Sequence, residues 1–327
     1  MSQEPATGSG QQPTPTPSRP RQVSLRARFR RDWRMLLMMV PGVLALLLFF
    51  YIPILGNVVA FQDFQPFLGF SGSEWVGLGN FIDLYDNPDF WNALKNTLVL
   101  ATFQLVLFFP VPLALALLVD SLVSSKVRRT FQSIVYLPHF LSWVLVIALF
   151  QQALGANGLV NNGLRSIGLD AIGFMTDPAT FPLMATFQLV WKDAGWAMII
   201  FLAALANVDV ELYEAAAADG AGRWRRLWHI TLPSIRAVVI LLLILRIGDI
   251  LSVGFEQFLL QRDSVGAGAA EVLDTFTYFS GVIGGDWGAG AAAGLAKGVV
   301  GLVLIIGANK LAHRFGEPGI FQSRKVA

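Results

Sequence analysis

Long runs of apolar residues, separated by short polar segments, dominate the pattern of this chain. A helix needs about 20 mostly apolar residues to cross the hydrocarbon core of a bilayer. Runs of that kind predict membrane-spanning helices at residues 35–61, 97–119, 131–149, 183–205, 234–253 and 288–310. No internal repeat is evident, so any two-fold symmetry would have to come from a second subunit. The predicted fold class is therefore an all-α membrane protein with six transmembrane helices.

The composition leads to the same conclusion. Of the 327 residues, 54% are hydrophobic and only 14% are charged, against roughly 25% charged residues in soluble domains. A soluble fold of this size could not bury so much apolar surface. The chain has no cysteine, and His139, His229 and His313 are far apart in the sequence. Disulfides, thiolate metal sites and histidine sites with the usual ligand spacing are thus excluded.

The distribution of basic residues predicts the orientation, because cytoplasmic loops carry an excess of Lys and Arg. Of the 24 basic residues, 18 lie in the N-terminal segment through Arg34, the second–third loop, the fourth–fifth loop and the C-terminal end. The three opposite loops hold one each, namely Lys95, Arg165 and Arg262. We therefore expect both termini on the cytoplasmic side.

The chain is expected to consist of a cytoplasmic N-terminal tail (1–34), a membrane domain (35–312) and a cytoplasmic C-terminal tail (313–327). Residues 1–20 are rich in Pro, Ser, Thr and Gln, a composition typical of disorder. Leu25, Phe29 and Trp33 then recur every four residues among arginines, which predicts a short helix on the inner leaflet. The first apolar run starts late and lacks an A-x-A-like site, so no cleaved signal peptide is expected.

The cytoplasmic loop between the fourth and fifth spans, residues 209–233, differs from an ordinary connection. Asp209 is suited to cap a helix, and the four alanines after Glu214 favour a slim helix. Gly220 and Gly222 break that helix and permit a sharp turn. A second short helix follows, and a proline suits the first turn of the next span. The loop is thus predicted to be a helix–turn–helix that projects from the membrane and fits the groove of another protein.

The same loop carries a sequence signature. Residues 214–233 match the pattern E-A-A-x3-G-x9-I-x-L-P at Glu214, Ala215, Ala216, Gly220, Ile230, Leu232 and Pro233. This resembles the EAA motif of the permease subunits of binding-protein-dependent ABC importers of the maltose-permease type, which have the type I permease fold. The resemblance covers about residues 35–321. Residues 136–143, 191–196 and 254–257 are also similar to the branch that imports complex oligosaccharides.

The resemblance implies a division of labour among subunits. In the family, this loop forms coupling helices that dock into a cleft of a cytoplasmic ATPase dimer, where Glu214 would meet a basic group and Gly220 would allow the bend. The chain has no G-x-x-x-x-G-K-[ST] phosphate loop and no catalytic constellation. We therefore expect no enzyme activity and no bound cofactor, since ATP and Mg would be used by the ATPase.

The other partners implied by the resemblance are a second, related but different permease, an extracytoplasmic solute-binding protein, a carbohydrate and membrane lipids, with no nucleic acid. The implied mechanism is alternating access, and the implied location is the bacterial cytoplasmic membrane.

Ionisable and aromatic residues in or near the spans are candidates for the substrate path. Charges at membrane depth are costly and usually face a cavity or one another, and sugars suit aromatic, charged and amide side chains. The candidates are Trp143, Trp191, Lys192, Asp193, Trp196, Arg246, Asp249, Phe255, Glu256, Gln257 and Lys297. Arg246 and Asp249 lie three residues apart and can pair on one helix face. The alternatives are that this pair only locks two helices together and that the tryptophans are interfacial anchors.

Two further features have simpler interpretations. His139 follows Pro138, where a kink frees backbone groups, and we expect its role to be structural. The outer loops are acidic and aromatic, which would suit docking of a binding protein but is also common in solvated loops. Their acidic residues are Asp63, Glu74, Asp83, Asp86, Asp89, Asp170 and Asp177.

Three other functions compete with a carbohydrate permease of an ABC importer. A permease for another small solute would carry the same loop. An ion-coupled secondary transporter would use the intramembrane carboxylates, but it predicts repeat symmetry within one chain. A membrane-embedded enzyme would need a converging nucleophile or metal set. The coupling loop and the missing phosphate loop favour the ABC importer permease, with an oligosaccharide as the expected substrate.

Overall fold

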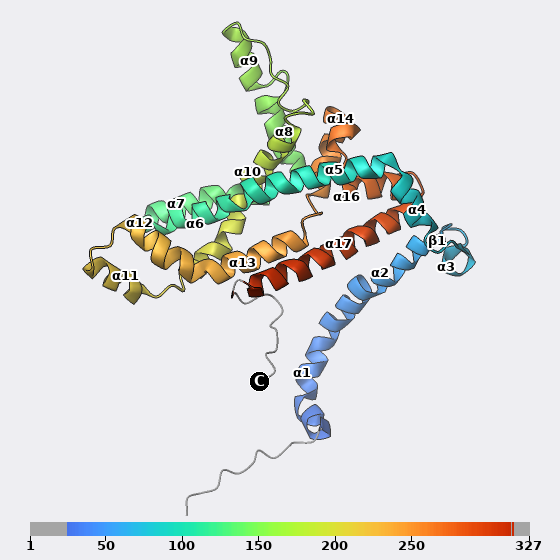
Figure 1. Cartoon of the computed structure of the whole chain (residues 1–327), viewed down its shortest axis with the longest axis horizontal. Coiled ribbons are helices and arrows are strands. Elements are labelled where there is room, and N and C mark those ends of the chain that lie inside the picture. The colour runs from blue at the N-terminus through green and yellow to red at the C-terminus, as the bar shows by residue number, and fades with distance from the viewer. Residues whose placement is uncertain (1–24, 315, 317–327) are drawn as a thin grey trace, which may run out of the picture. The chain divides into compact units, whose positions relative to one another are not determined.

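The computed structural model describes residues 25–314 and residue 316 (Figure 1). In this part of the chain, six helices are long and apolar enough to cross a membrane, which confirms the predicted all-α, six-span fold. They are Asp32–Phe61, Pro88–Asp120, Trp143–Ser166, Phe181–Leu205, Arg223–Gly248 and Trp287–Arg314. The predicted disordered segment 1–20 and nearly all of residues 315–327 lie outside the described residues.

The chain forms two compact units, Met1–Gly56 and Asn57–Ala327. In the described part of the first unit, α1 (Leu25–Leu46), a π-helical segment η1 (Leu47–Tyr51) and α2 (Ile52–Leu55) follow one another without a break. The short helix predicted around Phe29 is therefore continuous with the first span. Every side chain from residue 33 to residue 55 is exposed. A helix that is apolar on all sides must be covered by lipid or by another chain.

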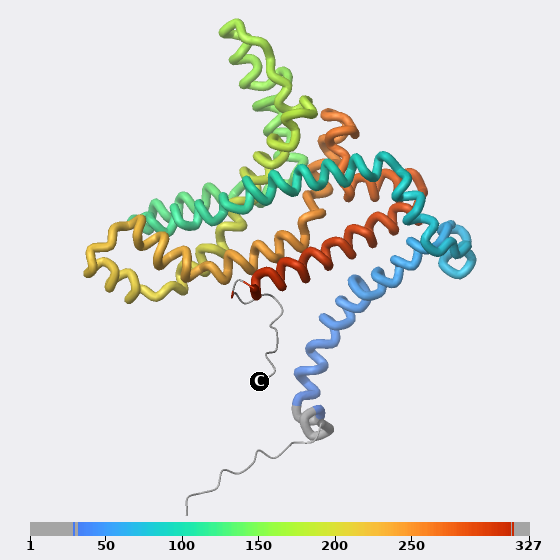
Figure 2. Tube along the Cα trace, in the orientation of Figure 1, coloured from blue at the N-terminus to red at the C-terminus, as the bar shows by residue number. Residues whose placement is uncertain are grey.

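The second unit contains the other five spans. Figures 1 and 2 show α5 and α6, α13, and α17 running lengthwise, with α11 and α12 at one end and β1 and α4 at the other. The elements up to the fourth span are η2 (Gly56–Phe61), β1 (Gln62–Asp63), α3 (Gly69–Gly72), β2 (Glu74–Trp75), α4 (Gly79–Asp86), α5 (Pro88–Phe103), η3 (Gln104–Phe108), α6 (Pro110–Asp120), α7 (Ser125–Tyr136), η4 (Leu137–Phe140), α8 (Trp143–Leu154), α9 (Leu159–Ser166) and α10 (Phe181–Leu205).

The remaining elements lead from the coupling loop to the last span. They are α11 (Val210–Ala218), α12 (Arg223–Arg226), η5 (Leu227–Thr231), α13 (Leu232–Gly248), α14 (Phe255–Val265), α15 (Ala267–Ala270), α16 (Leu273–Phe276), η6 (Thr277–Ile283) and α17 (Trp287–Arg314). Strands β1 and β2 form one antiparallel pair, Gln62 opposite Trp75 and Asp63 opposite Glu74.

The third predicted span, 131–149, is wrong in its bounds because the helix breaks inside it. The helix α7 ends at Tyr136, η4 makes one 3₁₀ turn, and Leu141 is extended at ψ 137°. Ser142 then caps α8, accepting a hydrogen bond from the Leu145 N–H at 3.4 Å. Pro138 lies in this break, since proline removes a helix donor and clashes with the preceding turn. The sequence predicted a kink here, whereas the structure has two separate helices.

The fifth predicted span, 234–253, is displaced toward the N-terminus. A continuous helix runs from Arg223 through η5 to Gly248. Residues 249–254 then leave helical geometry, and Gly254 has φ 121°. The second short helix predicted for the loop is thus the start of the fifth span itself.

Three prolines inside the spans each follow a π-helical turn. The N–H groups of Ile52, Phe109 and Leu232 donate to the carbonyl oxygens five residues earlier, and a proline comes next each time. Proline has no N–H, and its ring clashes with the carbonyl four residues before it. A π turn is wider than an α turn, so it accommodates the ring and lets the helix continue.

The core of the second unit centres on α10. In its most apolar window 39% of residues are buried, against at most 22% in the other spans. Its Met198 and Phe201 pack with Ala116 of α6 and Ile235 of α13. At its other end, Phe181 packs with α5 and α14.

Glycine permits two very close helix contacts. A Cβ on Gly195 of α10 would lie 2.0 Å from the Val135 carbonyl oxygen of α7. A Cβ on Gly290 of α17 would lie 2.7 Å from Gly281 Cα in η6. Small residues allow such backbone approach in membranes, and the last span, α17, is rich in Gly and Ala at its start.

Replacing Gly290 by alanine should destabilise the protein. Alanine gains about 1 kcal/mol in helix propensity, but the clash with Gly281 forces a backbone shift that costs about 1–3 kcal/mol. A lower thermal midpoint of the detergent-solubilised protein is expected for Gly290→Ala. Gly307→Ala is the matched control, because nothing lies within 4 Å of a Cβ there. Equal midpoints for the two variants would contradict the packing.

Candidate functional site

The loop between the fourth and fifth spans begins with a capped helix, α11. The Asp209 carboxylate accepts a hydrogen bond from the Glu211 N–H at 2.9 Å, as predicted for the cap. Tyr213 Oη lies 2.9 Å from Thr231 Oγ1 in η5, so α11 is tied to the spanning helix. Glu214 is exposed on α11, where a partner protein can reach it.

The turn after α11 is a C-cap that requires a left-handed residue. The Ala221 N–H donates to the Ala216 carbonyl at 2.8 Å, and the Gly220 N–H donates to the Ala217 carbonyl at 3.0 Å. Gly220 has φ 73°. This pattern is the Schellman motif, in which glycine avoids the strain of positive φ. The predicted turn is located at Gly220, whereas Gly222 has φ −67° and caps α12.

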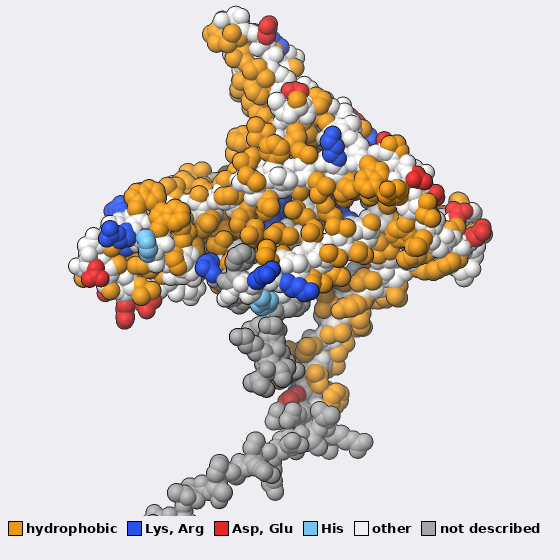
Figure 3. Space-filling view, in the orientation of Figure 1, with side chains coloured by type: hydrophobic (Ala, Val, Ile, Leu, Met, Phe, Trp, Pro, Cys, Tyr) orange, Lys and Arg blue, Asp and Glu red, His pale blue; other side chains and the backbone are white. Residues whose placement is uncertain are grey.

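The two arms of this hairpin carry opposite charge. The arm of α11 holds Asp209, Glu211, Glu214 and Asp219, and α12 holds Arg223, Arg225 and Arg226. Figure 3 shows red and blue side chains gathered at this end of the molecule. Between the arms lies a hollow of about 380 Å³. Among the motif residues, Ala216 and Ile230 line this hollow, Ala215 is exposed, and Leu232 and Pro233 begin α13.

A polar cluster forms at the break between α7 and α8. Lys192 Nζ donates to the His139 carbonyl at 2.8 Å, and Asp193 Oδ1 lies 2.8 Å from His139 Nδ1 and 3.4 Å from Lys192 Nζ. Lys192 is 7% exposed. The lysine therefore satisfies a carbonyl freed by the break, and the aspartate compensates its charge. We call these three residues the His139 cluster.

Tryptophans surround the His139 cluster. The Trp196 ring is stacked on the His139 ring with centroids 4.5 Å apart and an interplanar angle of 4°. Lys192 Nζ lies 5.6 Å from the Trp143 ring centroid, within cation–π distance. Phe140 also contacts the Trp196 ring, and Trp196 is 47% exposed, so part of an apolar ring surface is uncovered beside fixed charges. Trp191, in contrast, packs edge-on against Phe150.

Arg246 does not form the pair predicted with Asp249. Its guanidinium donates to Gln104 Oε1 in η3, and in the described chain no hydrogen bond or ion pair joins it to Asp249. α13 ends at Gly248, and Asp249 is its C-cap residue, whose N–H still donates to the Leu245 carbonyl at 3.2 Å. Asp249 therefore stays close to Arg246, and its charge acts on the guanidinium without a direct bond. Gln104 is fully buried, and its amide also donates to the Val253 carbonyl at 2.9 Å.

Asp249 and Lys297 line a common hollow of about 450 Å³. Lys297 Nζ forms an ion pair with Asp274 of α16, and Asp249 is exposed to the hollow. Gly248, Gly294, Gly298 and Gly301 form much of the lining. A carboxylate at this depth, with no ion pair among the described residues, is suited to face a polar substrate or a partner chain.

The remaining candidates belong to other surroundings. Gln257 is fully buried, donating to Gln188 Oε1 at 2.8 Å and to the Ala185 carbonyl at 2.9 Å, while Gln188 and Gln261 bond each other at 3.0 Å. Glu256 is exposed, and Phe255 contacts Tyr278 edge-on. Gln257 thus contributes to helix packing of α14 against α10.

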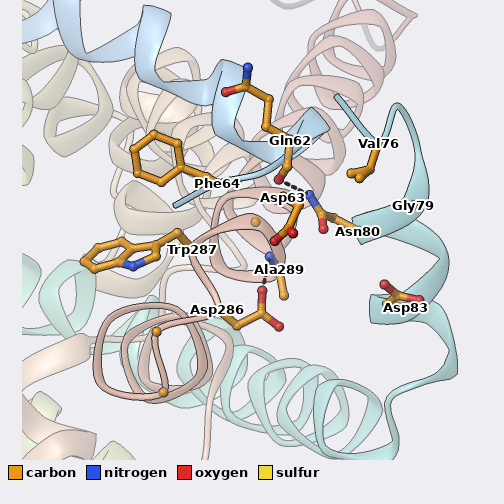
Figure 4. A pocket seen from close by; sticks show the side chains of 13 residues that line it. Gln62, Asp63, Phe64, Val76, Gly79, Asn80, Asp83, Asp286, Trp287 and Ala289 are labelled. Carbon is orange, nitrogen blue, oxygen red and sulfur yellow. Dashed lines mark hydrogen bonds between the residues drawn. The ribbon is translucent and has the colours of Figure 1, made fainter. Parts of the chain in front are cut away.

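Another hollow, of about 520 Å³, lies at the end remote from the coupling loop (Figure 4). Asp63 and Asp286 face its centre, with Trp287 and Phe64 on one side and Asp83 on the other. Asn80 donates to the Gln62 carbonyl at 2.9 Å, and Asp286 caps α17 by accepting from the Ala289 N–H at 3.0 Å. Two acidic residues that the sequence placed in an outer loop, Asp63 and Asp83, therefore share one cavity.

The structure thus brings together only part of the predicted path. Trp143, Lys192, Asp193 and Trp196 meet around one break. His139 has a more specific place than the sequence indicated. Sequence reasoning missed Gln104, Gln188, Gln261 and Asp274. Within the described residues, no three His, Cys, Asp or Glu side chains are placed to hold a metal ion.

Comparison with known proteins identifies the class. Residues 107–316 match the model of the binding-protein-dependent transport system inner membrane component. The chain belongs to this family of membrane permeases, as the loop signature and the six-span fold indicate.

Individual relatives cover most of the chain. Protein LplB of Bacillus subtilis is 45% identical over 91% of this chain and 94% of its own length. The polygalacturonan/rhamnogalacturonan transport system permease protein YteP of the same organism is 46% identical over 87% of this chain and 89% of its own. Among solved structures, a chain of a bacterial alginate ABC transporter, in complex with an alginate pentasaccharide-bound periplasmic protein, matches with a TM-score of 0.82 and 36% identity, over 90% of this chain and 99% of that chain.

Neutralising Asp193 should destabilise the His139 cluster. Asp193→Asn keeps the shape but leaves the Lys192 charge buried without a counter-charge, and breaking such a pair costs several kcal/mol. We expect a clear loss of folded protein on size-exclusion chromatography. The double variant Lys192→Met with Asp193→Asn should recover part of it. Full folding of the single variant would show that the lysine charge is compensated elsewhere.

Proposed function

We propose that this chain is a transmembrane subunit of an ATP-driven importer of carbohydrates, with an oligosaccharide as substrate. One relative of high identity and coverage is named for the transport of polygalacturonan and rhamnogalacturonan, and the structural neighbour for alginate. The His139 cluster supports the same substrate class. A half-exposed tryptophan ring beside fixed charges suits the apolar C–H face and the hydroxyl groups of a sugar.

One observation supports the mechanism most directly. The helix Arg223–Gly248 has 26 residues, which at 1.5 Å per residue corresponds to roughly 39 Å. It starts at the basic arm of the coupling hairpin and ends next to Arg246 and Asp249. A displacement of the hairpin is therefore transmitted to residues at membrane depth without an intervening flexible segment.

The chain has no phosphate loop for ATP, so the proposed importer needs partner subunits. We propose that two ATPase subunits bind ATP and Mg and that their closure moves α11 through Glu214, with hydrolysis resetting the cavity in an alternating-access cycle. A second, related permease supplies the other half of the path and covers the exposed first span. A solute-binding protein delivers the sugar at the end remote from the hairpin, where Asp63 and Asp83 line a cavity.

The proposed orientation places both termini and the hairpin in the cytoplasm of a bacterial cell. The chain is free of cysteine, so single cysteines can be labelled in intact cells. Ser166→Cys in α9 should react with a membrane-impermeant maleimide from outside, and Ser124→Cys, between α6 and α7, should react only after permeabilisation. Both serines are exposed. The reverse pattern would contradict the orientation.

Reversing the charge of Glu214 should uncouple the importer. If α11 docks on a basic group of the ATPase, Glu214→Lys brings like charges together, and we expect at least about tenfold weaker ATPase association. The measurements are co-purification of the ATPase and uptake of a labelled oligosaccharide in the reconstituted complex.

Glu74→Lys in β2 is the matched control, because Glu74 is also exposed but lies at the opposite end of the molecule. It should leave ATPase association unchanged. Wild-type association and uptake in Glu214→Lys would show that α11 is not the docking helix.

A further inference from the structure

A second polar hollow, of about 370 Å³, lies apart from the His139 cluster. The start of α5, the end of α14 and η6 form its walls, and these elements meet at the end of the second unit remote from α11 and α12 (Figure 1). Its volume falls at the lower end of the range for small-molecule sites. It is therefore suited to one small unit rather than to an extended chain.

A preorganised arginine lies in the hollow. Arg262 Nε donates to Glu271 Oε2 at 2.5 Å, and its guanidinium lies 4.0 Å from the Phe279 ring centroid. Glu271 is 6% exposed. The ion pair and the ring hold the guanidinium plane, while its Nη groups make no hydrogen bond within the described residues and remain available as donors.

Groups with free hydrogen-bonding capacity line the rest of the hollow. Neither the Asp89 carboxylate nor the Ser280 hydroxyl has a hydrogen-bond partner among the described residues, although both belong to the lining. The Asn92 amide nitrogen donates to the Gly268 carbonyl at 3.0 Å, which fixes the side chain and leaves its oxygen as an acceptor. Buried Glu271 Oε1 also lacks a partner.

The chemistry of this set selects among ligand classes. Asp89 and Glu271 outnumber Arg262, so a free anion is disfavoured. A metal ion would need more ligands, since no group of three His, Cys, Asp or Glu is found in the described chain. Charged and neutral donors and acceptors lie side by side around this small hollow. Such a set fits a ligand with several hydroxyl groups.

We infer that this hollow is a second carbohydrate site, which binds one glycosyl unit before the sugar reaches the His139 cluster. Arg262 donates to a hydroxyl or ring oxygen, Asp89 accepts from a hydroxyl, and Ser280 does either. The inference rests on the proposed function and adds a separate contact for the same substrate class at the end where it would enter.

The test measures sugar binding to the assembled importer in lipid nanodiscs, without the binding protein. The probes are labelled arabinotriose and labelled maltotriose, two neutral oligosaccharides. The Asp89→Ala, Ser280→Ala double variant removes two side chains that have no hydrogen-bond partner in the described part of the chain, so folding should be retained. Loss of two hydrogen bonds should weaken binding of at least one probe by about tenfold or more. Asp86→Ala, an exposed residue of α4 outside the hollow with the same charge change, is the control and should bind as wild type.

Two results would overturn the inference. One is an unchanged affinity of the double variant for both probes. If uptake by the wild-type importer still depends on the His139 cluster, that result leaves the proposed function intact. The other is that the double variant loses as much affinity for the sugar-free binding protein as for the probes, which would make the hollow a contact for that protein. If wild type neither binds nor takes up any oligosaccharide, the proposed function itself fails.

Discussion

Backbone groups that leave helical geometry inside a bilayer must find partners within the protein, because the hydrocarbon offers none. Two breaks in this chain, at residues 137–142 and 249–254, depend on that rule. Lys192 donates to the carbonyl freed at the first, and Gln104 donates to a carbonyl in the second. The polar residues inside the membrane therefore serve first to satisfy backbone groups at the breaks. Because these hydrogen bonds hold the backbone, the aromatic and charged side chains beside the breaks have fixed positions.

The sequence predicted the class of fold and the coupling hairpin well, since both rest on strong local signals. Apolar runs of spanning length need no tertiary information, and Asp209 and Gly220 are residues whose chemistry determines a cap and a left-handed turn. Helix ends inside the apolar runs were harder. Pro138 indicated a disturbance, but whether a proline kinks, breaks or widens a helix depends on neighbours. Pro233, for example, is accommodated by a π turn.

The polar contacts between spans could not be predicted, and the glutamines show why. Gln104 and Gln188 carry no charge, so they hardly interrupt the apolar pattern that identifies a span. Their importance lies in partners more than 70 residues away. Arg246 and Asp249 illustrate the opposite error, because a spacing of three residues permits a pair but does not select the partner. The two residues stay close, yet the guanidinium donates to Gln104 instead.

These contacts also constrain how a motion could pass through the molecule. The helix that starts at the hairpin ends where Arg246 meets Gln104, and Gln104 in turn holds the Val253 carbonyl beyond the break. One buried amide therefore joins the second span, the end of the fifth span and the segment leading to α14. If the hairpin moves the fifth span, this amide must either move with it or exchange a partner. An unsatisfied buried group costs about 1–3 kcal/mol, so intermediate positions are disfavoured and two discrete arrangements are expected.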